Sequence, residues 1–288
     1  MPATPAVTGG AGETAAARWR RLVEARLGEM ERLRPGGGAI GAAFWKSRAR
    51  WYHSRLPTEV AARDPFLRRL RRASGNQTTV IDVGAGTGRL ALNLAPRVRS
   101  VTAVDPSPHM LAILRDEARR LGVANVQVVE GRWEEVEMES ADIAFSSYVL
   151  PLGADAPGFV GKLSAAARRH AFLYLGAFSM DAVVDPLWRH FHGAPRQPGP
   201  SHLDAVAVLQ ELGLRPAVEV VEVANRTRFA SVAEAAKEYR DYLYLPAGRG
   251  ITRELEALLG SWLVPRSGAL GPPLRYVPAA IISWRPAG

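Results

Sequence analysis

Short apolar runs alternate with segments of helical spacing through the middle of this chain. The apolar runs lie at 79–86, 100–107, 125–133, 141–150 and 170–178. Segments of helical spacing lie between them at 88–98, 108–123 and 155–169. Because strands that alternate with helices form βαβ units, this pattern predicts a doubly wound α/β fold, in which helices cover both faces of a mostly parallel sheet.

Further patterns flank this region on both sides. Three helices are expected before it, at 14–34, 41–56 and 58–73, with Thr58 as the cap of the third and Asp64-Pro65 as an interruption within it. After the fifth apolar run we expect a helix plus loop at 179–200, helices at 201–214, 231–245 and 252–264, and strands at 215–225 and 274–284. The domain prediction is a disordered N-terminus (1–13), an N-terminal helical cap (14–75) and a main domain (76–288) with a helical insertion at about 230–265.

Composition limits the class of protein. The 288 residues include no cysteine, which excludes disulfides and thiolate metal ligands. No apolar run approaches the roughly 20 residues that a membrane helix needs. Residues 1–17 lack the basic start and the apolar middle of a secretory signal. We therefore expect a cytoplasmic protein without a membrane segment.

The chain is basic, with a formal net charge of +9. Its only lysines are Lys46, Lys162 and Lys237, so arginine supplies most of the 37 basic residues. Arginine-rich segments such as 66–75 can attract phosphates or RNA. The alternative, which we favour, is that these arginines lie on the solvated faces of amphipathic helices.

Three glycines follow the first apolar run at alternate positions. Gly84, Gly86 and Gly88 lie between a predicted strand and a predicted helix. Such glycines either make a tight structural turn or let a ligand approach the backbone at the positive end of the helix dipole. The position directly after a strand and before a helix favours the ligand cradle.

Two acidic residues end the first and second predicted strands. Asp82 can accept hydrogen bonds from an ammonium or hydroxyl group, and Asp105 can accept both hydroxyls of a ribose. This pair also fits a dinucleotide, but the loop reads Gly-X-Gly-X-Gly and not the Gly-X-Gly-X-X-Gly that binds a pyrophosphate. The spacing therefore favours a nucleoside that carries an amino acid.

These motifs resemble those of the class I S-adenosylmethionine-dependent methyltransferases, close to the methyltransferase type 11/25 group. The similarity rests on VIDVGAGTGRLALNLA (80–95) and VTAVDPSPHMLAILR (101–115), and it is clear over roughly 78–176. The resemblance implies a Rossmann-like, seven-stranded, mostly parallel sheet and S-adenosyl-L-methionine as cofactor, bound by the main domain. It places the loop against the methionine part of the cofactor, Asp105 on the ribose, and Pro106 and Met110 beside the adenine. The loop residues are Asp82, Gly84, Ala85, Gly86 and Gly88.

The chain departs from the family pattern after the third strand. Arg132 stands where the family usually has a small acid that bonds the adenine amino group. Trp133 then stacks on the purine, or it is an ordinary packing residue.

Two other segments match the family's cofactor contacts. Ser147 and Tyr148 end the fourth strand, where the resemblance implies a short polar stretch under the methyl group. FWKSRARWYH (44–53) resembles a helix that closes over the cofactor, with Tyr52 at its tyrosine position. Trp45 matches the tryptophan position, but we favour burial within the helix packing as its explanation.

Methyl transfer needs positioning and desolvation more than an indispensable catalytic group. A base helps only when the acceptor is a weak acid. The candidates are His190 and His202, with Tyr148 at the fourth strand; Ser201 can cap the helix at His202 and Asp204 can orient its ring. His192 lies two residues from His190, which separates the two rings on a helix, and we expect no metal site.

Three functions remain open from the sequence. The first is methyl transfer to a small-molecule acceptor, in a pocket walled by the helices outside the alternating region. The second is RNA or protein methylation, which the arginine-rich helices suggest, although the chain has neither a cysteine nucleophile nor an Asn/Asp-Pro-Pro-Tyr/Phe motif. The third is a non-catalytic S-adenosylmethionine-binding protein, which the altered segment at 130–133 suggests.

Overall fold

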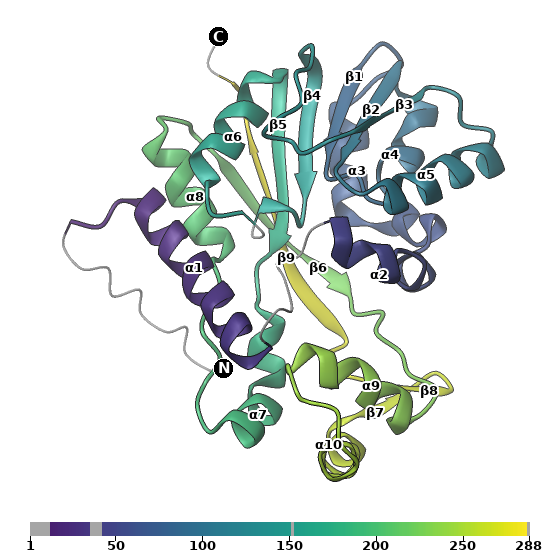
Figure 1. The fold of residues 1–288 in the computed structure, drawn as a ribbon. Coiled ribbons are helices and arrows are strands. Elements are labelled where there is room, and N and C mark those ends of the chain that lie inside the picture. Colours follow the sequence, from purple (N-terminus) through teal and green to yellow (C-terminus); the bar gives the residue numbers. More distant parts are fainter. Residues whose placement is uncertain (1–11, 35–41, 151–152, 287–288) are drawn as a thin grey trace.

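The computed structural model describes residues 12–34, 42–150 and 153–286. Its main sheet has seven strands in the order β3-β2-β1-β4-β5-β9-β6 (Figure 1). The first five are parallel, and β9 runs antiparallel to both of its neighbours. The strands are β1 (Thr79–Val83), β2 (Ser100–Asp105), β3 (Val126–Glu130), β4 (Ala141–Ser147), β5 (Ala167–Gly176), β6 (Ala217–Ala224) and β9 (Tyr276–Trp284). The predicted seven-stranded, mostly parallel sheet is confirmed.

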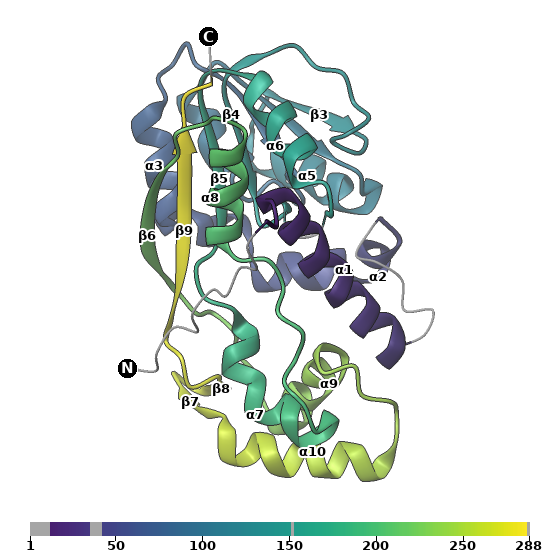
Figure 2. The same cartoon turned by 90° about the vertical axis from the view of Figure 1, so that its left-hand side faces the viewer.

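Helices cover both faces of the sheet, as the alternating pattern predicts (Figures 1 and 2). On one face α1 (Ala15–Leu33), α6 (Ala156–Ala165) and α8 (His202–Glu211) enclose a core around Trp19 and Phe159. On the other, α3 (Pro65–Ala73), α4 (Ala91–Leu94) and α5 (Pro108–Leu121) enclose a core around Phe66, Phe145 and Phe172. The strands are therefore buried on both sides, which explains their continuous apolar runs.

Local signals in the sequence start and end several of these helices. Asp64 caps α3 through the backbone N–H of Phe66 (2.9 Å), and Pro65 begins the helix. Ser107 caps α5, and Gly122 ends it in the left-handed region (φ 66°). The expected break at Asp64-Pro65 is confirmed, but Thr58 is not a helix cap. It lies inside the short 3-10 helix η1 (Thr58–Arg63).

The boundary between α6 and β5 differs from the prediction. The helical pattern extends to residue 169, but α6 ends at Ala165 and β5 begins at Ala167. The backbone N–H of Ala141 donates to the carbonyl oxygen of Ala166 (2.8 Å), and Ala141 pairs with Ala167. Pairing with β4 therefore outweighs the helix propensity of the alanines.

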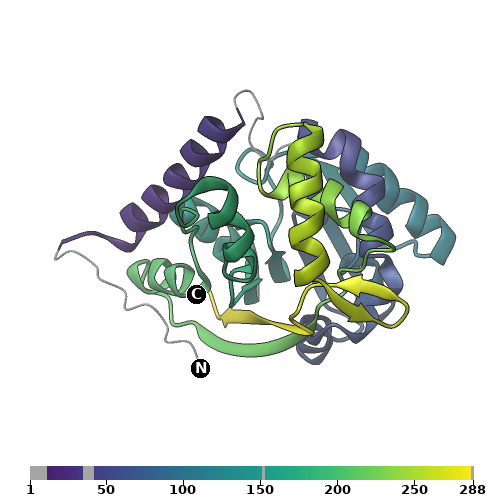
Figure 3. The same ribbon diagram turned by 90° about the horizontal axis from the view of Figure 1, so that it is seen from below.

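A third core lies beyond the carboxyl edge of the parallel strands, at the bottom of Figure 1 and nearest the viewer in Figure 3. It is formed by α7 (Met180–His192), α9 (Val232–Tyr242), α10 (Arg249–Trp262) and a hairpin of β7 (Val264–Arg266) and β8 (Ala269–Gly271). We call these elements the lower unit. Its buried centre includes Trp188, Phe229, Tyr239, Leu243, Leu255 and Leu259. The predicted insertion at about 230–265 covers α9 and α10 but lacks α7, which comes from the segment after β5.

The helices before the sheet lie in three different places. α1 packs on one face of the sheet and α3 on the other, whereas α2 (Ala42–Arg55) lies beside α5 (Figure 1). The helical cap at 14–75 therefore stays a prediction as a domain, and most of the predicted disordered segment 1–13 lies outside the described residues. Within the described residues, no helix has the length and apolar character to cross a membrane.

Candidate functional site

The three glycines between β1 and α4 all have positive φ angles, of 72°, 56° and 80°. A Cβ atom on Gly84 would lie 2.1 Å from Val149 Cγ2, and one on Gly88 would lie 2.7 Å from Leu114 Cγ. Packing inside the protein thus requires glycine at these two positions. A Cβ on Gly86 would meet only the flexible end of Met110, at 3.2 Å from Cε. Of the three, Gly86 is the one whose neighbour can most easily give way to a ligand.

Asp105 joins the glycine loop to the segment after β2. Its carboxylate accepts hydrogen bonds from the backbone N–H groups of Gly86 (2.9 Å) and Ser107 (2.9 Å). Burial raises the pKa of Asp105, although both N–H donors favour the charged form. A carboxylate held in this way still has lone pairs for the two hydroxyls of a ribose.

Asp82, at the end of β1, is 2% exposed. Burial raises its pKa to about 8, against the opposing influence of the positive charge of Arg89. Arg89 itself forms an ion pair with Asp64 (2.7 Å), so its charge is already engaged. A ligand ammonium group beside Asp82 would therefore lower its pKa and favour the charged carboxylate.

Thr87 is a residue of this loop that the motif analysis did not select. It is 1% exposed, and its hydroxyl has no hydrogen-bond partner among the described residues. Buried hydroxyl groups are normally paired. An unpartnered hydroxyl in the loop that joins β1 to α4 indicates a place where a polar ligand completes the hydrogen bonding.

Helix α2 brings Tyr52 to the same loop. Burial raises the pKa of Tyr52, and its hydroxyl is close enough to Arg89, Asp105 and Asp82 for their charges to act on it. The Trp45 ring packs edge-on against Tyr52, with ring centroids 5.3 Å apart. The structure thus brings Tyr52 together with the loop acids, and Trp45 supports it from behind.

Tyr148 follows β4 in an unusual backbone conformation, with φ at 60°. Bulky residues rarely adopt this region, and such outliers gather at functional sites. The ring is 47% exposed and packs edge-on against Tyr174 (5.2 Å between centroids). Burial of its hydroxyl raises the pKa of Tyr148 to about 12, while the buried Tyr174 hydroxyl has no partner among the described residues. Ser147 is half-buried at the end of the same strand.

The two residues expected near the adenine have different surroundings. Arg132 is exposed and forms an ion pair with Glu135 (3.3 Å). Trp133 is 4% exposed, and its indole N–H donates to the carbonyl oxygen of Phe159 (3.4 Å). Lys162 lies over its ring at 5.0 Å. These contacts account for Trp133 as a packing residue, and its stacking on a purine stays a prediction.

Pro106 and Met110, expected beside the adenine, lie at the start of α5. Pro106 is exposed, whereas Met110 is buried with its Cε facing Gly86. Both are placed at the loop, and their contacts with a ligand stay predictions.

The histidines do not form one cluster. His190 bonds Glu254 through Nε2 (2.7 Å), and His192 bonds the carbonyl oxygen of Leu243 (2.8 Å), both within the lower unit. His202 begins α8, on the face of the sheet that carries α1 and α6.

The expected capping of α8 by Ser201 is present, but Asp204 is engaged by Ser201 and by Arg18 (2.7 Å). The catalytic roles of these histidines stay predictions. Among the described residues, no three histidine or acidic side chains gather as metal ligands would.

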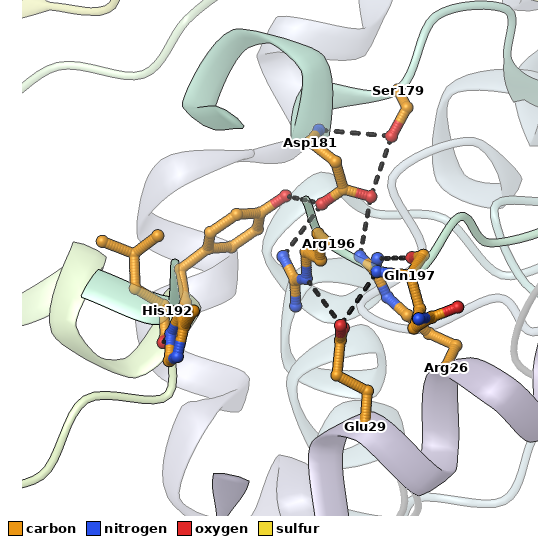
Figure 4. Close-up of polar contacts among 9 residues, drawn as sticks. Arg26, Glu29, Ser179, Asp181, His192, Arg196 and Gln197 are labelled. Carbon is orange, nitrogen blue, oxygen red and sulfur yellow. Dashed lines mark hydrogen bonds and ion pairs between the residues drawn. The ribbon is translucent and has the colours of Figure 1, made fainter. Parts of the chain in front are cut away.

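A buried charge cluster that sequence analysis missed links α1 to the lower unit (Figure 4). Asp181 accepts hydrogen bonds from Arg26 (2.7 Å), Arg196 (2.9 Å) and the hydroxyl of Tyr242 (2.8 Å). Glu29 accepts from the backbone N–H of residue 197 (2.9 Å) and lies 3.8 Å from Arg196 Nε. Burial alone would raise the pKa of Asp181, but the two guanidinium charges lower it below its ordinary value.

Aromatic rings enclose the guanidinium group of Arg196. Its central carbon lies 4.4 Å from the ring centroid of Trp188, 4.8 Å from that of Tyr242 and 4.9 Å from that of Tyr244. The side chain is 5% exposed. The cluster therefore works as a fixed joint between α1, α7 and α9.

Comparisons with known proteins identify the domain around the glycine loop. A family model described as "Methyltransferase domain" matches residues 80–169. The chain is 44% identical over 54 residues to the 23S rRNA (uracil(1939)-C(5))-methyltransferase RlmD of Chromohalobacter salexigens, a match over 19% of this chain and 11% of that protein. It is 28% identical over 128 residues to the uncharacterized methyltransferase YcgJ of Bacillus subtilis, over 43% of this chain and 49% of that protein. The chain spans less than half the length of these curated relatives.

Solved structures share the fold over most of the chain. The crystal structure of YcgJ from Bacillus subtilis has a TM-score of 0.51 and 17% identity, covering 77% of this chain and 98% of that one. Magnesium protoporphyrin IX methyltransferase (ChlM) from Synechocystis PCC 6803, solved with bound SAH, has a TM-score of 0.50 and 13% identity, covering 94% of this chain and 99% of that one. At these identities the likeness establishes the fold.

Proposed function

From the class I S-adenosylmethionine-dependent methyltransferase domain that this chain contains, we propose that the protein transfers a methyl group to a small-molecule acceptor by in-line displacement. The observation that carries this proposal is the cofactor loop. In and beside it lie two buried carboxylates, the backbone of Gly86 with only the flexible end of Met110 against it, and the unpartnered hydroxyl of Thr87. These groups fit a nucleoside that carries an amino acid.

The loop residues bind and orient the cofactor. Asp105, held by the N–H groups of Gly86 and Ser107, faces the ribose hydroxyls, and Asp82 neutralises the ammonium group. Tyr52 closes the loop from α2. When bound, S-adenosylmethionine supplies an electrophilic methyl group on a sulfonium, so the donor arrives already activated.

Tyr148 and the lower unit form the acceptor side. Tyr148 directly follows β4, and the carboxyl ends of the parallel strands are directed toward the lower unit (Figure 1). Its raised pKa keeps the hydroxyl neutral, which suits it to orient an acceptor by a hydrogen bond and not to act as a base. A separately packed unit over this edge limits access and excludes water, which favours a small acceptor over a large one.

Ligand-induced stabilisation tests the cofactor site. S-adenosylhomocysteine should raise the melting temperature. At a ligand concentration of about 100 times its Kd, the free energy of unfolding should increase by about 2.7 kcal/mol. Asp105→Asn should remove most of this rise, because one of the two acceptor oxygens becomes an NH2 donor, which can accept neither from a ribose hydroxyl nor from the backbone N–H groups of Gly86 and Ser107. Glu130→Gln, at the exposed end of the neighbouring strand β3, is the matched control and should keep it. A rise with NAD and none with S-adenosylhomocysteine would point to a dehydrogenase instead.

Transfer of a labelled methyl group tests the acceptor class. The protein is incubated with labelled S-adenosylmethionine and with separate small-molecule, RNA and protein fractions of a cell extract. Label should enter the small-molecule fraction. Label in RNA or protein alone would replace the small-molecule proposal, and binding without transfer to any fraction would indicate a non-catalytic cofactor-binding protein.

A further inference from the structure

Four arginines gather toward the amino edge of the sheet, away from the glycine loop. Arg69 and Arg72 come from α3, Arg169 from the start of β5, and Arg285 follows β9. We call these four residues the arginine patch. Because β9 is antiparallel to β5, its end lies beside the start of β5, and α3 leads into β1 at the same edge (top of Figure 1).

Several contacts show that these charges face one region. The central guanidinium carbon of Arg69 lies 5.3 Å from the ring centroid of Phe172, which lies 6.1 Å from that of His170. Burial, followed by the positive charges of Arg285, Arg169 and Arg69, lowers the pKa of His170. An open hollow of about 540 Å³ has both Arg72 and Arg169 in its lining. The patch is therefore continuous from α3 across β5 to the end of β9.

The patch has no acidic partner of its own. Among the described residues, none of its four arginines takes part in an ion pair within 4.0 Å, although many other arginines of the chain do. Asp142 lies in the hollow, but its carboxylate is engaged by Thr79 and Arg168. Positive charges that share one surface without acidic partners attract an external anion.

We propose that the arginine patch is a docking surface for the phosphate backbone of RNA. Guanidinium groups bind phosphates through paired N–H donors, and the amides of Asn76 and Gln77 in the hollow supply the neutral donors that accompany them in such interfaces. The lining of the hollow includes no large apolar side chain. Protein interfaces and membrane-surface contacts are commonly anchored by such side chains, whereas nucleic-acid interfaces are polar and positively charged, as this lining is.

Docking at this patch is separate from methyl transfer. The patch lies at the amino ends of the strands, and Tyr148 and the glycine loop lie at the carboxyl ends. From Arg169 to Gly176 along β5 the distance is about 20 Å or more at the usual rise per strand residue. RNA held here positions the protein on a larger assembly and does not present its bases to the cofactor. The inference therefore stands independently of the proposed function.

Salt-dependent binding tests the proposal. Fluorescently labelled single-stranded RNA is titrated with the full chain from about 50 to about 200 mM KCl. If the patch neutralises four phosphates, log K should fall with log salt at a slope of about −3. Arg72→Gln/Arg169→Gln, at the two arginines that line the hollow, should reduce this slope by about 1.4, because two phosphate contacts are lost.

A matched pair on α10 controls for net charge. Arg249 and Arg253 are exposed, as Arg72 and Arg169 are, and lie at the opposite end of the molecule. Arg249→Gln/Arg253→Gln should leave the slope within about 0.3 of the unchanged protein, since these arginines contact no phosphate. The rise in melting temperature with S-adenosylhomocysteine shows that both double variants are folded.

Three results would overturn the proposal. One is the absence of RNA binding even at low salt, and another is an equal loss in the two double variants, which would mean diffuse attraction by net charge. The third is displacement of RNA by polyglutamate or by anionic vesicles as effectively as by unlabelled RNA, which would indicate an acidic protein or a membrane. None of them would change the S-adenosylhomocysteine result, so the proposed function is tested separately.

Discussion

Asp82 in the glycine loop and Asp181 in the lower unit are two mostly buried carboxylates whose pKa values shift in opposite directions. Burial raises the pKa of Asp82 to about 8, because the nearby cation of Arg89 is already paired with Asp64. Asp181 accepts directly from Arg26 and Arg196, the second of which also faces Glu29, and its pKa is lowered despite burial. The first carboxylate lacks a cation, and the second is supplied with two.

The same contrast holds for the hydroxyl groups of the two regions. Thr87 in the glycine loop has no partner among the described residues, whereas Tyr242 donates to Asp181 at 2.8 Å. The Tyr242 hydroxyl thus has a partner within the protein, and its contact joins α9 to α7. In the proposed cofactor site, the Thr87 hydroxyl is free to bond a ligand. We therefore expect this pair of hydroxyls to distinguish the joint from the binding site, because buried hydroxyl groups are normally paired.

The largest expected effect comes from breaking the joint. Arg196→Met should lower the free energy of unfolding by about 3–5 kcal/mol, because it leaves Asp181 and Glu29 buried with too little positive charge. Urea unfolding measures this. Arg189→Met is the control on α7, where an exposed pair with Asp185 contributes at most about 0.5 kcal/mol.

A second substitution keeps the test informative if Arg196→Met does not fold. Arg196→Lys retains the charge but loses the planar group that stacks on three rings, and it should cost about 1–2 kcal/mol. If neither Arg196 variant loses more stability than Arg189→Met does, the cluster is not a joint.

The sequence predicts the glycine loop far better than the joint, for a physical reason. The loop is local: strand, glycines and helix are continuous in the chain, and Asp82 and Asp105 end consecutive parallel strands that pair side by side. The joint unites residues from α1, α7, α9 and the segment between α7 and α8, which are brought together only by tertiary packing. In the sequence, Arg26 is an ordinary polar position of an amphipathic helix.

Other features that were not predicted from the sequence also depend on tertiary packing or are too short to give a pattern. The hairpin β7–β8 has strands of three residues, too short for any periodicity to show. Thr87 is hidden inside the glycine motif, and only the burial of its hydroxyl marks it. The strained backbone of Tyr148 also has no sequence signal, because its φ of 60° is imposed by the surroundings and not by the residue type.

The next largest expected effect comes from the protonation of the Asp82 carboxyl group. Below pH 8 the folded, ligand-free protein keeps this carboxyl protonated, whereas the unfolded chain loses the proton near its ordinary value, so stability falls as the pH rises between about 4 and 8. Binding of the ligand ammonium requires the charged form. S-adenosylhomocysteine should therefore bind more tightly as pH rises from 6 to 8, by up to roughly tenfold per unit, with release of a proton.

Asp82→Asn should remove most of this pH dependence. Calorimetry in two buffers of different ionisation enthalpy counts the proton released by the unchanged protein and by the variant. The neighbouring groups that face Asp82 are Arg89 and Asp105, so Asp105 accounts for any dependence that remains. Affinity that is constant between pH 6 and 8 in the unchanged protein would contradict the assignment of Asp82 to the ammonium group.

The smallest expected effect is on the free energy of unfolding. Removing the Thr87 hydroxyl should raise it, whereas removing the Tyr242 hydroxyl should lower it. Thr87→Val removes a buried hydroxyl that no described residue satisfies, so it should stabilise the ligand-free protein by about 1 kcal/mol. Tyr242→Phe removes a donor to a charged carboxylate at a partly exposed position, so it should destabilise by about 1 kcal/mol. Urea unfolding of both variants measures the two values. If Thr87→Val instead destabilises the protein and leaves the S-adenosylhomocysteine affinity unchanged, the hydroxyl serves packing, and the distinction between joint and binding site fails at this residue.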